Sequence, residues 1–278
     1  MKKIIDISHH NNVDKIIGVD GVMIRATFGK VGIDSCLEKH VRLAEESKIP
    51  YGFYFYSYAL NTETALTEVT HFLSVIAKYK PTLPLAIDME DADSYKKRNG
   101  FPNNKTLVNI CKIACEEIEK HGYYALIYAS DSWFTTYLRD SELDRYGKWV
   151  ARWGEKNPVT TYQMWQYTST GNVNGINGNV DISRTILDFT VLFKKMKAKT
   201  ENVKTDNDVS RETFSENVLK VGDKVKVTSR YDYNGVKCAK WVLTTVFDVI
   251  QVSNDRVVIG IDGKVTSAWT PDKIVKID

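Results

Sequence analysis

Short apolar runs alternate with amphipathic stretches from Met1 to about Lys194. The runs of strand-like composition are Lys3–Ile7, Val22–Ala26, Tyr51–Tyr58, Leu83–Met89, Ala125–Ala129, Trp149–Trp153 and Gln163–Tyr167. A helical period of apolar residues marks Leu37–Lys48, Glu63–Tyr79 and Lys105–His121, and Gly122 suits the left-handed position after the last helix. Strands that alternate with helices predict a parallel sheet with right-handed crossovers.

The predicted fold class of this first domain, residues 1–193, is α/β. So many strands in a segment of this length favour an irregular (β/α) barrel, similar to a TIM barrel, over an open doubly wound sheet. The first strand is not followed by a glycine-rich phosphate-binding loop, which also argues against a dinucleotide-binding fold.

Residues 194–217 are highly charged, poor in aromatic residues and without an apolar period, which is typical of a linker. Met196 lies near its start, where internal initiation or cleavage would release the following segment as a separate product. Residues 218–278 contain only strand-like runs, at Lys224–Thr228, Val242–Val249, Arg256–Ile261 and Ile274–Ile277. The dipeptides Asn234-Gly235 and Asp262-Gly263 indicate hairpins, so we predict a small all-β, SH3-like barrel here.

Composition narrows the classes of function. The net charge of +3 is too small to indicate a nucleic-acid partner, and no apolar run is long enough to span a membrane. The N-terminus lacks the apolar stretch of a signal peptide, so we expect synthesis in the cytoplasm. Cys36, Cys111, Cys115 and Cys238 form no Cys-x-x-Cys pair and lack companion ligands, which predicts reduced thiols and neither a metal nor a cofactor.

The segment Leu85–Glu90 carries the clearest chemical signal, because an apolar strand ends in two carboxylates, Asp88 and Glu90, two positions apart. Positions i and i+2 of a strand point to the same face, with Cα atoms about 6.5–7 Å apart. Two acids presented together suit acid-assisted cleavage of a glycosidic bond. Asp6 and Asp181 also follow apolar residues, so we expect them to join the pair, although each could instead be a structural cap.

Several motifs in the first domain, taken in order, resemble glycoside hydrolase family 25, the muramidases of bacterial and phage lysozymes. They are Asp6-Ile7-Ser8, the segment 24–30, the aromatic segment 50–59, Asp88-Met89-Glu90, the segment 164–168 and Val180-Asp181. Two positions depart from many members of the family, with Phe28 in place of a Glu and Phe55 in place of a His. We expect these departures to alter substrate contacts and not the reaction.

The resemblance implies hydrolysis of the β-1,4 bond between N-acetylmuramic acid and N-acetylglucosamine in peptidoglycan. We expect Glu90 to be the general acid, its pKa raised by partial burial and by Asp88, which would stay ionised and stabilise positive charge. The second step would use either water from the opposite face or, as we prefer, the substrate's own N-acetyl oxygen. Asp6 and Asp181 would frame the sugar or the acid pair.

Aromatic side chains stack on the apolar faces of sugars, so those near strand ends are candidates for a glycan groove. We expect substrate contacts from Tyr54, Tyr56, Tyr128, Trp153 and Trp165. Tyr58 and Tyr167 are expected to pack in the core. His9 and His10 have no companion metal ligands or nucleophile, and we interpret them as solvated loop residues.

A lysozyme domain, a charged linker and a small β-domain together resemble a modular phage endolysin, which reaches the cell wall at host lysis. The small domain would bind peptidoglycan or secondary wall polymers, with Tyr231, Tyr233, Trp241 and Trp269 as candidate contacts. Self-association through this domain is a rival role, and each of these aromatics could instead be core. Two alternatives to the muramidase are a non-catalytic wall-binding protein and a chitinase-like enzyme.

Overall fold

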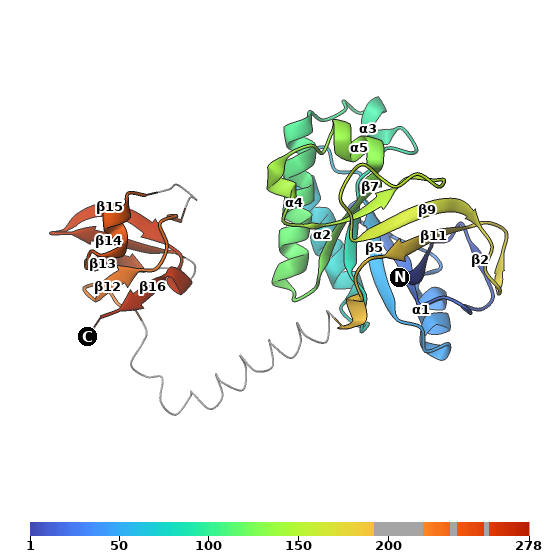
Figure 1. Ribbon diagram of the computed structural model, residues 1–278, viewed down its shortest axis with the longest axis horizontal. Coiled ribbons are helices and arrows are strands. Elements are labelled where there is room, and N and C mark those ends of the chain that lie inside the picture. Colours follow the sequence, from blue (N-terminus) through green and yellow to red (C-terminus); the bar gives the residue numbers. More distant parts are fainter. Residues whose placement is uncertain (192–218, 234–237, 253–255, 278) are drawn as a thin grey trace. The chain divides into compact units, whose positions relative to one another are not determined.

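The computed structural model describes residues 1–191, 219–233, 238–252 and 256–277. The chain divides into two compact units, Met1–Thr200 and Glu201–Asp278 (Figure 1). The predicted linker at 194–217, with Met196, and the predicted hairpin turn at Asn234-Gly235 lie outside the described residues.

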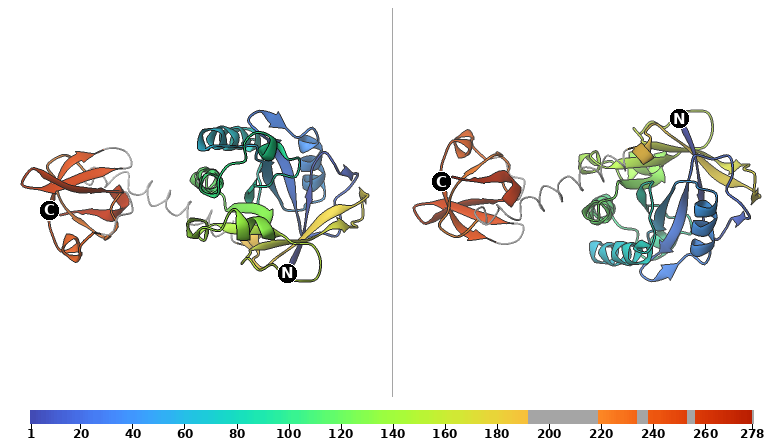
Figure 2. Two further views of the ribbon diagram at one scale, coloured as in Figure 1. Left: turned by 90° about the horizontal axis from the view of Figure 1, so that it is seen from above. Right: turned by 90° about the horizontal axis from the view of Figure 1, so that it is seen from below.

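In the described part of the first unit, eight strands close into a barrel (Figures 1 and 2). These strands are β1 (Lys2–Ile7), β3 (Gly21–Phe28), β5 (Tyr51–Tyr56), β6 (Leu85–Asp88), β7 (Ala125–Ser130), β8 (Gly147–Ala151), β9 (Met164–Gly171) and β11 (Val180–Thr185). Neighbouring strands run parallel from β1 through β3 and β5 to β9, as the alternation of strands and helices predicts.

The prediction of an all-parallel sheet is wrong at β11, which lies antiparallel between β9 and β1 and closes the barrel. The reason is the short connection between β9 and β11, because a parallel crossover needs a dozen or more residues. Three shorter strands flank the barrel, namely β2 (Asn12–Val13), β4 (Gly32–Ile33) and β10 (Ile176–Asn177). Strand β4 pairs with β3, and β2 pairs with β10.

Helices cover the outside of the barrel. They are α1 (Leu37–Glu46), α2 (Thr62–Ile76), α3 (Tyr95–Arg98), α4 (Asn104–Lys120), α5 (Asp131–Thr136) and the 3₁₀ turn η1 (Ser141–Leu143). The side chains of Asn61 and Asn103 cap α2 and α4 by accepting backbone N–H groups, and Gly122 follows α4 at φ +81° as predicted. Cys111 and Cys115 are free thiols on the buried face of α4, also as predicted. No helix among the described residues could cross a membrane.

The described part of the second unit is an antiparallel five-stranded sheet in the order β15-β14-β13-β12-β16. Its elements are β12 (Lys224–Val227), η3 (Lys240–Leu243), β13 (Phe247–Val252), β14 (Val257–Ile261), β15 (Lys264–Trp269), η4 (Pro271–Lys273) and β16 (Ile274–Lys276). Asp262 and Gly263 both have positive φ and join β14 to β15, which confirms that hairpin.

Two predictions for the second unit need correction. The expected strand Val242–Val249 begins only at Phe247, because the preceding residues form η3, where the Thr244 and Thr245 hydroxyls donate to the Trp241 carbonyl. The sequence pattern also missed β15, half of whose residues are exposed.

Candidate active site

The site is one layer of inward-facing side chains at the carboxyl ends of the barrel strands. Ile4, Met23, Ala86, Leu126 and Met164 belong to one apolar cluster, which forms the floor. Two positions later on the same strands stand polar residues: Asp6, Arg25, Asp88, Tyr128 and Gln166. Side chains two positions apart on a strand point to the same face. The polar residues therefore face the barrel interior, like the apolar floor, but lie one layer nearer the carboxyl ends of the strands.

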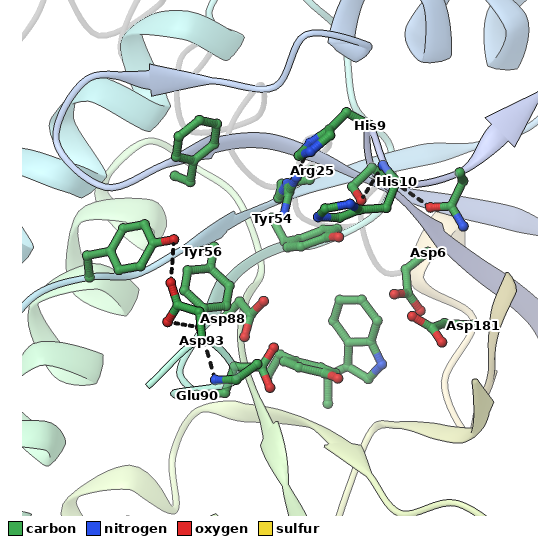
Figure 3. Close-up of a pocket in the computed structure, with 17 residues that line it drawn as sticks. Asp6, His9, His10, Arg25, Tyr54, Tyr56, Asp88, Glu90, Asp93 and Asp181 are labelled. Atoms are coloured by element: carbon green, nitrogen blue, oxygen red, sulfur yellow. Dashed lines mark hydrogen bonds between the residues drawn. The ribbon is translucent and has the colours of Figure 1, made fainter. Parts of the chain in front are cut away.

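The cavity has a volume of about 430 Å³ (Figure 3). Its lining includes all four predicted acids, Asp6, Asp88, Glu90 and Asp181. The structure therefore brings together carboxylates that lie far apart in the sequence, from the paired strands β1 and β11 and from the end of β6, which neighbours neither of them in the barrel.

Asp88 is the last residue of β6 and is 4% exposed, whereas Glu90 lies just beyond the strand and is partly buried. The backbone of this segment is held on both sides, because Met89 N donates to Tyr128 O at 2.9 Å and Asp88 O accepts from Ser57 N at 3.1 Å. Asp88 Oδ1 is buried without a hydrogen-bond partner among the described residues. An unpartnered buried oxygen beside a cavity is suited to a donor brought by a ligand.

Burial raises the pKa of Asp88 well above its ordinary range, and the charge of Glu90 adds to the effect. Burial also raises the pKa of Glu90, although the Lys96 ammonium opposes that shift. Because two buried carboxylates cannot both ionise cheaply, the pair holds a proton to higher pH than two separate, exposed carboxylates would. The expectation that Asp88 is the ionised partner needs refinement, since Asp88 is the more deeply buried acid.

Asp6 and Asp181 face each other across the antiparallel pair of β1 and β11. Burial and the charge of Asp181 raise the pKa of Asp6 well above its ordinary range, and burial raises that of Asp181. Gln166 Nε2 donates to both oxygens of Asp6, at 3.2 and 3.1 Å. Gln166 Oε1 accepts from the Tyr128 hydroxyl at 3.1 Å and from Trp153 Nε1 at 3.0 Å, so the amide has a fixed orientation.

Lys96 is a site residue that the sequence did not reveal. Its side chain is fully buried, and its ammonium donates to Glu90 O at 2.7 Å and to Ser57 O. Nearby, the buried carboxylate of Glu68 accepts from Ser57 Oγ at 2.7 Å and from Tyr58 N at 3.0 Å. Lys96 therefore ties the segment that carries the acid pair to the end of β5. The run Lys96-Lys97-Arg98 looks like an ordinary solvated surface in the sequence.

The predicted aromatic contacts divide between two hollows. Tyr54, Tyr56 and Tyr128 line the cavity, as does Tyr58, which the sequence assigned to the core. The Tyr58 hydroxyl donates to Asp93 Oδ2 at 3.0 Å, so its ring lies at the cavity edge. Of the two positions that depart from the family pattern, Phe28 lines the cavity, while Phe55 is fully buried.

Trp153 and Trp165 lie outside this cavity and line a second hollow together with Tyr167 and Arg184. Trp165 is only 1% exposed, and its Nε1 donates to Arg152 O at 2.7 Å. Trp153 is 63% exposed, and its Nε1 donates to Gln166, the residue that also holds Asp6. Tyr167 is partly buried at the core, and it also borders this hollow.

His9 and His10 are exposed, as expected of loop residues, yet both line the cavity wall. In the second unit, Tyr231, Tyr233 and Trp241 are exposed, whereas Trp269 is 0% exposed and its Nε1 donates to Ser229 O at 3.0 Å. The prediction that Trp269 contacts a wall polymer is therefore wrong, because its ring fills the core of the sheet. Across the described residues, no group of three or more His, Cys, Asp or Glu could hold a metal ion.

A closed barrel with paired carboxylates at its strand ends is typical of glycoside hydrolases. The family model for glycosyl hydrolases family 25 matches residues 5–176, and this chain belongs to that family. The chain is 28% identical over 173 residues to the autolytic lysozyme of Clostridium acetobutylicum, covering 62% of this chain and 50% of that protein. It is 25% identical over 192 residues to lysozyme M1 of Streptomyces globisporus, covering 64% and 65%.

Solved structures give a consistent picture of the fold. The modular autolysin LytC of Streptococcus pneumoniae, in complex with a synthetic peptidoglycan ligand, matches with a TM-score of 0.57 and 29% identity over 66% of this chain and 46% of that chain. The CTP1L endolysin matches with a TM-score of 0.58 and 24% identity over 70% of each chain. The chain spans between half and about two-thirds of the length of the curated relatives it matches.

Proposed function

We propose that this chain is a peptidoglycan hydrolase that cleaves the β-1,4 bond between N-acetylmuramic acid and N-acetylglucosamine. The observation that carries the proposal is the presentation of Asp88 and Glu90 into an open cavity at the end of β6. Membership in family 25, relatives named as lysozymes and the LytC complex with a peptidoglycan ligand support the same substrate class.

Glu90 acts as the general acid in this proposal. When substrate binds, its acetamido N–H donates to the unpartnered Asp88 Oδ1 and so favours the ionised form of Asp88. The proton that the pair retains then resides on Glu90, which donates it to the leaving glycosidic oxygen as the bond to C1 breaks. The acetamido oxygen attacks C1 and forms an oxazolinium, and the Asp88 carboxylate stabilises its positive charge.

Water completes the reaction by adding to C1 while the Glu90 carboxylate takes its proton, and the acetamido group is restored. The competing route is direct attack by water on the opposite face, which inverts the configuration at C1. The two routes differ in their first product, so NMR of the anomer released at early times separates them. Release of the inverted anomer would exclude the oxazolinium.

The other predicted site residues receive supporting roles. Asp6, held by Gln166, and Asp181 frame the sugar beside the acid pair. Tyr54, Tyr56 and Tyr128 supply aromatic surface to that sugar. Trp153 and Trp165 belong to a second hollow, where the exposed ring of Trp153 would meet a more distant part of the glycan.

We also propose that the chain is a modular endolysin with a catalytic domain at 1–193, a linker at 194–217 and an SH3-like wall-binding domain at 218–278. Tyr231, Tyr233 and Trp241 remain the candidate contacts to peptidoglycan or secondary wall polymers, because their side chains are exposed. Light scattering of the full chain tests the rival role of self-association, and a monomer would exclude it.

Mass spectrometry of digested cell walls tests the proposed reaction. Products with reducing-end muramic acid are expected from a muramidase. Reducing-end glucosamine would instead indicate the chitinase-like alternative, a glucosaminidase. Binding to walls without release of any fragment would support the non-catalytic alternative, which the assembled carboxylates argue against.

A further inference from the structure

The cavity has two electrically different walls. Asp88, Glu90 and Asp181 lie along one side, and His9, His10 and Arg25 lie along the other (Figure 3). Catalysis accounts for the acidic wall, but nothing in the proposed reaction uses the basic one. A ligand that carries a negative charge would be repelled by the acids and attracted to the opposite side.

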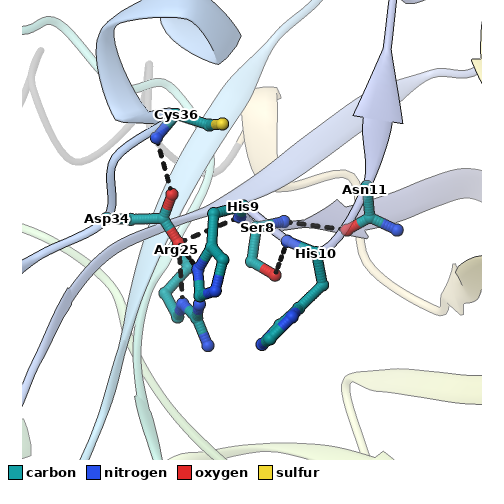
Figure 4. Close-up of polar contacts among 7 residues, drawn as sticks. All are labelled: Ser8, His9, His10, Asn11, Arg25, Asp34 and Cys36. Carbon is teal, nitrogen blue, oxygen red and sulfur yellow. Dashed lines mark hydrogen bonds and ion pairs between the residues drawn. The ribbon is translucent and has the colours of Figure 1, made fainter.

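The basic wall is built on a buried carboxylate, Asp34 (Figure 4). Asp34 Oδ2 accepts from Arg25 Nε at 2.9 Å and from His9 N at 3.1 Å, and Oδ1 accepts from Cys36 N at 2.9 Å. Although burial opposes ionisation, these hydrogen bonds hold the pKa of Asp34 below its ordinary value. Asp34 is therefore a charged anchor that joins the loop after β1 to β3.

Arg25 provides the charge of this wall. Its Nε is engaged with Asp34 and its Nη2 contacts His9 Nδ1, while Nη1 makes no hydrogen bond to the described residues. The Arg25 side chain is 11% exposed, and Phe28 packs near its guanidinium, with 5.7 Å from Cζ to the ring centroid. A guanidinium held in this way keeps donors directed at the cavity in a fixed geometry, which suits a carboxylate.

His10 adds a neutral donor beside this charge. Its ring lies 3.9 Å from that of His9, centroid to centroid. Burial, together with neighbouring His9 and Arg25, holds the pKa of His10 below its ordinary value, so the imidazole is neutral at neutral pH. The basic wall thus combines one permanent cation with imidazole groups that can donate hydrogen bonds.

We infer that Arg25, with His9 and His10, binds a carboxylate carried by the muramoyl unit of the substrate. This inference rests on the proposed function and specifies how the site would recognise its substrate. N-acetylglucosamine has no carboxylate, whereas the muramoyl unit carries one on its lactyl group or on the attached stem peptide. Placing that carboxylate against Arg25 orients the sugar, and the acidic wall disfavours the reverse orientation.

Kinetics on matched substrates test the inference. One pair is a peptide-free glycan with free lactyl carboxylates and the same glycan as its methyl ester. The second pair is a peptide-bearing glycan with free and with amidated stem carboxylates. For the unmodified protein we expect KM to be about tenfold lower for the charged member of one pair, as for a charge-assisted hydrogen bond. The pair that responds identifies the source of the carboxylate.

The matched variants are Arg25→Gln, which keeps a donor for Asp34 but removes the charge, and Lys30→Gln. Lys30 is exposed and lines a different hollow, so its loss controls for net charge. Arg25→Gln should raise KM by about tenfold more for the charged substrate than for the neutral one. Lys30→Gln should change neither. If Arg25→Gln fails to fold, His10→Asn takes its place. We expect His10→Asn to weaken the preference for the charged substrate over the neutral one.

Equal KM values of the unmodified protein for both members of both pairs would overturn the inference while leaving the proposed function intact. An Arg25→Gln effect of equal size on charged and neutral substrates would also overturn it, because that outcome indicates a structural role. Failure of the unmodified protein to cleave any of the four glycans would instead refute the proposed function, and this inference with it.

Discussion

The two units bury different kinds of side chain. In the described part of the first unit, several ionisable or amide side chains are almost fully enclosed, namely Asp6, Asp34, Glu68, Asp88, Lys96 and Gln166. In the described part of the second unit, every buried residue is either apolar or a glycine. Val225, Phe247 and Trp269 form the centre of its core.

This difference indicates where each unit can carry function. Burying a charged group is unfavourable unless the group is paired. A cluster of such groups therefore lowers the stability of the fold and indicates a functional site. In the first unit, the buried ionisable side chains therefore mark the candidate site. The described interior of the second unit only stabilises the fold, so the proposed wall contacts of this unit fall on exposed aromatics such as Trp241.

The largest effect is expected from Asp88→Asn. The variant removes the carboxylate that stabilises positive charge, so turnover should fall about 10²–10³-fold. It also removes a buried carboxyl group whose ionisation burial disfavours, so the folded state should gain about 0.5–2 kcal/mol at neutral pH. Turnover on cell walls and thermal unfolding of both proteins check the two effects.

The pH dependence of that gain follows from the raised pKa of Asp88. Protonated Asp88 stabilises the folded protein below its unfolded value of 3.8, and this contribution is lost as pH rises toward the folded value. The unfolding temperature of Asp88→Asn should therefore exceed that of the unmodified protein by more at pH 7 than at pH 4. Full activity of Asp88→Asn, or a lower unfolding temperature than that of the unmodified protein at pH 7, would contradict the view that the first unit buries this carboxyl group for function.

A smaller effect is expected from Lys96→Met, which leaves the carbonyls of Ser57 and Glu90 without their buried donor. The free energy of unfolding should fall by about 2–3 kcal/mol. Because Lys96 opposes the rise in the pKa of Glu90, the general acid, its loss should move the alkaline limb of the pH–rate profile to higher pH. Lys97→Met is the matched control, since Lys97 is the exposed neighbour. Equal behaviour of the two variants would remove Lys96 from the site.

The smallest effect is expected in the second unit. Trp241 is 48% exposed on η3, so Trp241→Ala should leave the unfolding temperature nearly unchanged and weaken retention on cell walls by about fivefold. Leu243→Ala, an exposed apolar change on the same turn, should leave retention unchanged. Cosedimentation with purified walls measures both, and an equal loss in the two variants would exclude stacking by Trp241.

The sequence predicted the main strands of the barrel because apolar runs bounded by turns leave a clear pattern. It did not predict β11 as a strand, because Val180 and Ile182 are its only apolar residues and every other residue of Val-Asp-Ile-Ser-Arg-Thr is polar. The acid pair was predictable because side chains two positions apart along an extended segment share a face, although Glu90 lies just beyond the end of β6.

Other features depend on contacts that sequence patterns do not encode. Lys96 and Gln166 resemble solvated polar residues until the fold encloses them, and Arg25 acquires its role only through Asp34. Trp269 and Trp241 are indistinguishable by composition, yet one fills the core and the other is exposed. Burial, rather than residue type, decides these roles.

The central claim is that Glu90 protonates the leaving oxygen of a muramoyl linkage. Its most direct test is the rate at which the unmodified protein and Glu90→Gln release fragments ending in reducing muramic acid from the same cell walls. We expect such fragments from the unmodified protein and a rate lower by about 10²–10⁴-fold for Glu90→Gln with folding unchanged. Comparable rates from the two proteins would contradict it.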